Sequence, residues 1–192
     1  MTRGEILSVE EFRNHWQTLY GDTLPLGHRL RHAFPNRWFR IHTLPESKRY
    51  PENPAETTEI LRRHNTIISD LLEPNNEFTL ILMTFLTQEK PERPDAQFSL
   101  ENPEKLEWLR TDFDEIWQHF WISQHVWQPG ILDDLLRHVM NDSLRFVISS
   151  VQKKCVYAPY DGGADVILEF PEQRNTMREK YSSWLSLHPQ RL

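Results

Sequence analysis

The sequence lacks most of the features from which a function can be read directly. It has one cysteine, Cys155, so no disulfide can form within the chain. No hydrophobic run comes near the roughly 18 residues of a membrane-spanning helix, and the first residues do not resemble a signal peptide. Basic residues number 22 and acidic residues 28, a net charge of −6 that argues against nucleic-acid binding. These absences predict a cytoplasmic protein with no nucleic-acid or membrane partner.

Common catalytic and cofactor signatures are also missing. The sequence has no GxSxG, GxGxxG, Walker or HExxH pattern and no cysteine pair for zinc. Nine histidines are present, but His119 and His125 would lie roughly 20 Å apart along one strand, too far to share an ion. His28 and His32 have no carboxylate at motif spacing. We therefore expect no metal site and no cofactor.

Two residues of catalytic type are expected to be structural. Cys155 belongs to an apolar strand pattern, where a thiol is usually inert. His64 lies within the apolar stripe of a helix, where a buried imidazole is more often hydrogen-bonded core than catalyst.

What the sequence does contain is enough apolar material for one packed core. Hydrophobic residues make up 38% of the 192 residues and aromatic residues 11%, which excludes global disorder and predicts a single domain over residues 1–192. Ser8 and Glu11 form a capping-box pattern before a helix that ends at Gly21. Asn53 and Pro54 begin a second helix, which we expect to run to Leu72.

Two more helices and several strands complete the expected fold. Helices are predicted after Pro129-Gly130 and from Pro171, and strands over 37–44, 78–86, 117–126, 144–149, 155–158 and 164–170. Residues 22–36 read as a loop with at most one helical turn, and residues 88–104 as a flexible loop. The predicted class is α+β: a mostly antiparallel sheet of five to six strands with about four amphipathic helices.

The segment 37–63 is the best candidate for anion binding, because it holds six basic residues against four acidic ones. Arg40 and His42 project from the same strand face beside Trp38, and Arg49 follows in the next loop; an arginine so placed can hold a phosphate or carboxylate with two hydrogen bonds. The alternative is a solvated basic edge that discourages sheet-to-sheet pairing.

Residues 160–165, Tyr-Asp-Gly-Gly-Ala-Asp, form the most motif-like stretch. Asp161 and Gly162 at the centre of a tight hairpin would supply the positive φ angles that such turns use. Turn chemistry explains each residue except Asp165, so both Asp161 and Asp165 remain candidate site residues.

Two larger surfaces are open to more than one interpretation. Trp117, Trp121 and Trp127 share a strand face that is either covered by a helix or a binding surface, and helix cover is expected because several amphipathic helices must be placed. Residues 101–115 hold six acidic residues against two basic ones and could attract a basic partner or simply aid solubility.

Several stretches carry a family resemblance. They are FPNRWFRIHTLPESKRYP with EILRRHNTIISDLL, and WQPGILDDLLRHV with YAPYDGGADVILEFPEQRNTMREKYSSWL. They resemble a family of small uncharacterised bacterial proteins, a domain of unknown function that ends in a Tyr-Asp turn, an apolar strand and a closing helix. The matching positions here are Tyr160, Asp161, Gly162, Asp165, Tyr181 and Trp184. The resemblance implies a bacterial, cytosolic α+β protein and no particular reaction.

Two functions from different classes follow. The first is a non-enzymatic protein-binding module, immunity-like or accessory, whose partner would be another protein. The second is an enzyme that acts on a small anionic substrate through Arg40, His42 and Arg49, with Asp161 or Asp165 as general base. Convergence of Arg40, His42 and one of these carboxylates in a single pocket would favour the enzyme.

Overall fold

The computed structural model describes residues 7–86, 104–106 and 117–185. Most of the predicted loop at 88–104, and all of the acidic 101–115 segment except 104–106, lie outside the described residues. The strands are β1 (Trp38–His42), β2 (Glu77–Leu86), β3 (Glu104–Leu106), β4 (Trp117–Val126), β5 (Arg145–Ser150), β6 (Cys155–Tyr160) and β7 (Gly163–Ile167). The helices are α1 (Val9–Tyr20), α2 (Gly27–Ala33), α3 (Pro54–Leu72), α4 (Asp133–Met140) and α5 (Pro171–Lys180).

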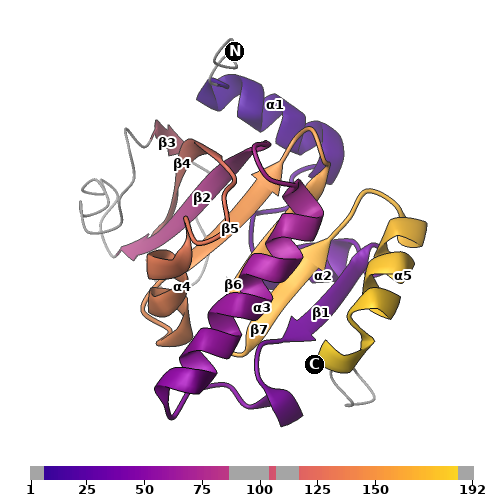
Figure 1. The fold of residues 1–192 in the computed structure, drawn as a ribbon. Helices are drawn as coiled ribbons and strands as arrows, with labels where there is room; N and C mark the ends of the chain where they lie inside the picture. Colours follow the sequence, from indigo (N-terminus) through magenta and orange to yellow (C-terminus); the bar gives the residue numbers. More distant parts are fainter. Residues whose placement is uncertain (1–6, 87–103, 107–116, 186–192) are drawn as a thin grey trace.

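The strands form one sheet in the order β1-β7-β6-β5-β2-β4-β3, and every neighbouring pair is antiparallel (Figure 1). The α+β class and the antiparallel sheet are therefore confirmed. The sheet has six longer strands, as expected, plus the three-residue β3.

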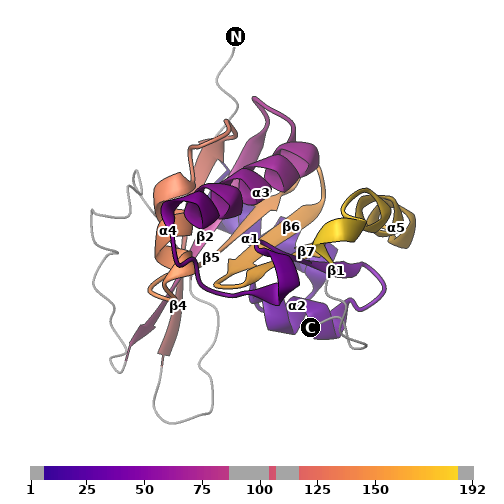
Figure 2. The same ribbon diagram turned by 60° about the horizontal axis from the view of Figure 1, so that its bottom comes forward.

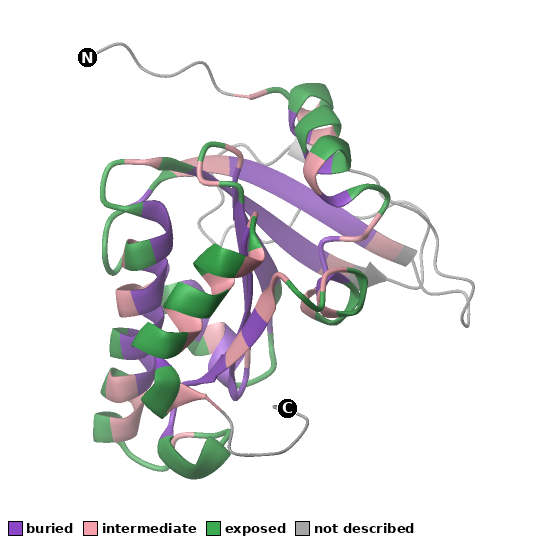
Figure 3. Cartoon of the chain, turned by 90° about the vertical axis from the view of Figure 1, so that its right-hand side faces the viewer, coloured by how far each residue is buried: buried purple, intermediate pink, exposed green. Residues whose placement is uncertain are grey.

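Helices cover both faces of the sheet. The α3 and α4 helices pack on one face, and α1 and α2 on the other, so the molecule has three layers (Figures 1 and 2). Each side has its own hydrophobic core: one contains Ile67, Leu80 and Leu136, and the other contains Trp16, Leu30 and Ile81. Figure 3 shows the buried central strands between more exposed helix surfaces. The α5 helix lies beside β1 and packs Met177 against the first core.

The caps that the sequence predicts are present. Ser8 accepts a hydrogen bond from the Glu11 N–H while Glu11 accepts one from the Ser8 N–H, and Gly21 follows the last residue of α1 with φ of 60°. Asn53 caps α3 through the Glu56 N–H. Both helices therefore begin where the sequence predicts.

For residues 22–36 we predicted at most one helical turn, but this segment contains the two-turn helix α2. Its N-cap, Leu26, offers no side-chain acceptor, and its first turn has no acidic residue. The helix forms because Leu30 is fully buried in the core below the sheet. Tertiary packing thus replaces the missing local signals.

Helix cover is confirmed for the described tryptophans of the 117–127 face. Trp121 and Trp127 are buried in the α3 and α4 core, and their indole N–H groups donate to Thr84 and Ser69. The side chain of Trp117 lies outside the described part of the structure. In that part, no helix has the length and apolar character needed to cross a membrane.

Candidate functional site

The candidate site lies where β5 and β6 separate. The two strands pair only from Ile148↔Tyr157 to Ser150↔Cys155, so the ladder stops before Pro159. Proline has no N–H to donate, and Pro159 could not continue the β5 ladder from its own amide. On its other side Pro159 still pairs with Ala164 of β7. The result is a fork in the sheet that opens beside the β6–β7 hairpin.

A cavity of about 360 Å³ occupies this fork, which we call the fork cavity. Its walls include both strands of the fork, β1 and β7, α2, and the loops that follow β1 and precede β5. The lining residues used below are His28, Arg40, Arg49, Asp142, Arg145, Tyr160, Asp161 and Asp165. Three arginines and three aspartates therefore surround a space of the size that small ligands or a partner's side chains fill.

Arg40 and Asp165 form the most buried charge pair of the fork cavity. The β1–β7 register places them directly opposite each other. Arg40 Nε lies 2.8 Å from Asp165 Oδ1 and Nη2 lies 3.0 Å from Oδ2, while the Trp38 indole N–H donates to Oδ1 at 2.8 Å. The two side chains are 14% and 6% exposed. Asp165 thus holds β1 against β7, which accounts for the residue that turn chemistry left unexplained.

Gly27 belongs to the same arrangement. A Cβ on this residue would lie 2.9 Å from Asp165 Oδ2, so a side chain there would push α2 away from the carboxylate. The absence of a side chain lets the helix approach β7 closely.

Asp161 is held in a second pair at the rim. Arg49 Nη2 lies 2.5 Å from Asp161 Oδ2, and the Tyr50 hydroxyl donates to the same oxygen at 2.8 Å. Burial raises the pKa of Asp161, but the hydrogen bonds from Arg49 and Tyr50 outweigh it, and the net pKa is lowered. Asp161 is therefore ionised and already bonded at neutral pH. The Arg49 side chain itself stays 61% exposed.

The 160–163 segment is the predicted hairpin, since Tyr160 pairs with Gly163 and leaves Asp161 and Gly162 as the turn. The expected positive φ angles are wrong: neither Asp161 nor Gly162 lies in the left-handed region. Glycine is required at Gly163 for space instead, because a Cβ there would lie 1.9 Å from the carbonyl oxygen of Ile41.

His42 is the candidate that the structure does not bring to the fork cavity. It lies on β1 and is 7% exposed, but it does not line the cavity. Its buried ring nitrogens make no hydrogen bond of normal geometry with another described residue. Burial and the charge of Arg40 lower its pKa, which favours the neutral ring.

The structure therefore joins Arg40, Arg49, Asp161 and Asp165 in one cavity and leaves His42 outside it. Sequence reasoning missed Asp142, Arg145 and His28 as cavity residues; they come from the α4–β5 loop, β5 and α2, respectively. Pro159 inside an apolar strand was the signal that could have pointed to the fork. Burial, with help from Arg29 and Arg31, lowers the pKa of His28.

The remaining candidates are part of the interior. His64 is fully buried and its Nδ1 lies 2.5 Å from the Tyr157 hydroxyl, as expected for a core histidine; burial lowers its pKa to about 3. Burial raises the pKa of Cys155 to about 12, which keeps the thiol protonated. Among the described residues, no group of three or more His, Cys, Asp or Glu side chains is arranged to hold a metal ion.

A family model described as a domain of unknown function, DUF3885, matches residues 26–189, which include the fork cavity and both charge pairs. No curated protein and no solved structure matches the chain.

Proposed function

Because the chain belongs to the DUF3885 family, whose description assigns no function, we propose a function from the site itself: a non-enzymatic module that binds a partner protein. The fork cavity receives a side chain or short segment of that partner. The observation that carries this proposal is that the two candidate bases of the cavity, Asp161 and Asp165, are already bonded to arginines.

A general base needs a carboxylate or imidazole that can accept a proton from the substrate. Both carboxylate oxygens of Asp165 already accept hydrogen bonds from Arg40 and Trp38. The lowered pKa of Asp161 makes that residue a poor proton acceptor. Such fixed pairs suit recognition better, because they present charges in a set geometry that does not have to be organised on binding.

The exposed side of the fork cavity supplies the contacts. Arg49 and Arg145 have side chains 61% and 59% exposed, and Arg145 Nη2 lies 3.5 Å from Asp142 Oδ1. Because more than half of each side chain is exposed, both arginines can donate to acidic or carbonyl groups of a partner.

The test uses immobilised protein, a lysate of the source cells and a charge reversal at the cavity. We expect a protein that is captured by the wild type and by the control Arg137→Glu, and lost with Arg145→Glu. Arg137 is on α4, has a side chain 50% exposed and does not line the cavity. Binding of the purified partner is then measured by calorimetry. If Arg145→Glu and Arg137→Glu retain every captured protein equally, the proposal is wrong.

One observation favours a second function, an enzyme for a small anionic substrate. Arg40, Arg49 and two carboxylates do converge in one cavity. In that case substrate would displace Asp161 from Arg49 and free it as a base. A small anion that is turned over by the wild type, and bound but not turned over by Asp161→Asn, would support this function over the first.

A further inference from the structure

The outer edge of β1 is open among the described residues. This strand ends the sheet order, and among the strands that the structure describes it pairs with β7 alone. The Leu168 N–H donates to the Arg37 carbonyl and the Thr43 N–H to the Gly162 carbonyl. In an antiparallel pair the bonded residues alternate, so Phe39 and Ile41 direct their backbone groups toward β7. The backbone groups of Trp38, Arg40 and His42 face away from the sheet.

One of these outward groups already has a partner. The His42 carbonyl accepts a hydrogen bond from Arg63 Nη1 at 3.0 Å, which closes the C-terminal end of the edge. Trp38 and Arg40 remain, each with an outward N–H and C=O, and these four groups match the bonding pattern of a short added strand.

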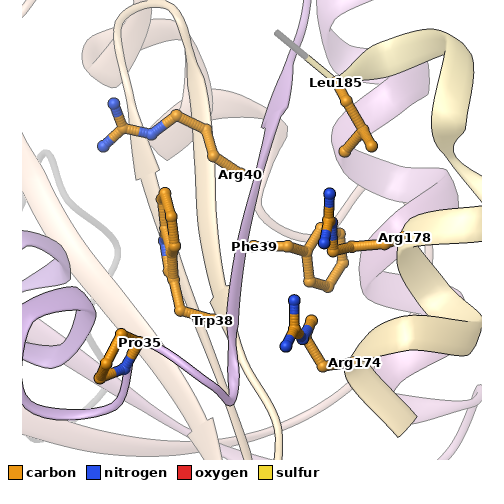
Figure 4. A pocket seen from close by; sticks show the side chains of 7 residues that line it. All are labelled: Pro35, Trp38, Phe39, Arg40, Arg174, Arg178 and Leu185. Atoms are coloured by element: carbon orange, nitrogen blue, oxygen red, sulfur yellow. The ribbon is translucent and has the colours of Figure 1, made fainter. Parts of the chain in front are cut away.

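A cavity of about 110 Å³ lies along this edge (Figure 4). Trp38 and Arg40 lie on one side of β1, whereas Phe39, Leu185 and the arginines of α5 lie on the other. Since its lining comes from both sides of the strand, the cavity includes the space where a neighbouring strand would run, about 4.8 Å from β1.

The charge of this space is positive. Among the described residues, its lining includes Arg174 and Arg178 of α5 and no carboxylate. The Nε of Arg174 is buried without a hydrogen-bond partner in the described part of the chain. Guanidinium groups form charge-assisted hydrogen bonds with carboxylates, so the two arginines of this lining favour an acidic ligand.

We propose that an acidic, extended segment of a partner protein binds as an added strand along β1, with its carboxylates on the side of Arg174 and Arg178 and its apolar side chains against Trp38. A second copy of this chain is a poor occupant, because edge-to-edge pairing would bring two sets of these arginines together. The inference concerns a different surface from the fork cavity and holds whether or not that cavity binds a partner.

The test uses a defined probe rather than the unidentified partner. The capped peptide acetyl-EVEVE-amide places its glutamates on one side and its valines on the other when extended. By NMR we expect it to slow hydrogen exchange at the amides of Trp38 and Arg40 and to leave Phe39 and Ile41 unchanged, because those two amides are already bonded to β7. Uniform changes along β1, or none, would overturn the proposal.

Two controls separate strand addition from simple charge attraction. N-methylation of alternate peptide residues removes the donors on one edge, so one of the two alternate N-methylated peptides should lose binding and the other should keep it. The lysine peptide acetyl-KVKVK-amide should not bind. Equal binding of both methylated peptides, or binding of the lysine peptide, would refute an acidic added strand.

The protein variants give the matching readout. Arg174→Glu combined with Arg178→Glu should weaken the binding of acetyl-EVEVE-amide at least about tenfold. Arg137→Glu should change its affinity less than about twofold. Circular dichroism confirms that each variant is folded. Unchanged affinity in the folded double variant would overturn the role of α5, and a stable dimer at micromolar concentration that the peptide does not dissociate would overturn the choice of occupant.

Discussion

Asp165 is the residue on which the candidate site depends most. It joins β1 to β7 through Arg40 and Trp38 while almost fully buried. We predict that Asp165→Asn lowers the free energy of unfolding by about 3 kcal/mol, because it leaves the Arg40 charge without its partner. Urea melts measure the change. Asp142→Asn, at an exposed pair, should cost less than about 0.5 kcal/mol, and an equally small effect for Asp165→Asn would mean that the pair does not hold the strands.

Gly163 tests whether space or backbone conformation selects glycine in the hairpin. Its added Cβ would clash with the Ile41 carbonyl, so Gly163→Ala should force β1 away from β7 and cost about 2 kcal/mol or more. Gly21→Ala is the matched control: Gly21 has φ of 60° and no atom within 4 Å of an added Cβ, so only backbone strain of about 1 kcal/mol is expected. If Gly21→Ala proves the more damaging in thermal melts, steric contact is not the reason for Gly163.

At the scale of elements, the sequence predicted those structures that are specified locally. The α1 and α3 boundaries follow from Ser8 and Asn53, whose caps act on residues three positions away. The α2 helix escaped prediction because its stability comes from Leu30 packing under the sheet. The site was predictable only as separate residues: Arg40 and Asp165 lie 125 positions apart, and only the β1–β7 register makes them partners.

The α3 helix should owe its stability to its buried stripe. Ile68 is fully buried and shares a core with Leu80 and Leu82 of β2. We predict that Ile68→Ala costs about 2–5 kcal/mol through lost burial and a residual cavity. Ile131, 48% exposed, provides the same substitution outside the core and should cost less than about 0.5 kcal/mol. Urea melts that gave similar values for both would place the stripe at the surface.

At the scale of the whole molecule, the two open places of the sheet have different causes. The fork cavity exists because Pro159 ends the β5–β6 ladder, whereas the β1 edge is open because the sheet ends there. The β1–β7 pair lies between them, with Arg40 lining both cavities. Substitutions that break the Arg40–Asp165 pair should therefore change binding at both surfaces. Charge reversal at Arg145 should change binding only at the fork cavity, and charge reversal at Arg174 only at the β1 edge.

The stability of the whole molecule should depend on pH through His64. Its pKa is about 3 in the folded chain and near 6.5 when exposed by unfolding, so below pH 6.5 the unfolded state binds the extra proton. The contribution of neutral His64 to the free energy of unfolding is therefore fully present above pH 6.5. It falls by about 1.4 kcal/mol per pH unit as the pH drops toward 3. We predict that His64→Gln removes this contribution between pH 6 and pH 4 in urea melts. His28 and His42, whose pKa values are also lowered, should leave a smaller residual slope. The exposed His15→Gln control should keep the wild-type slope, and an unchanged slope in His64→Gln would show that the imidazole is protonated within the fold.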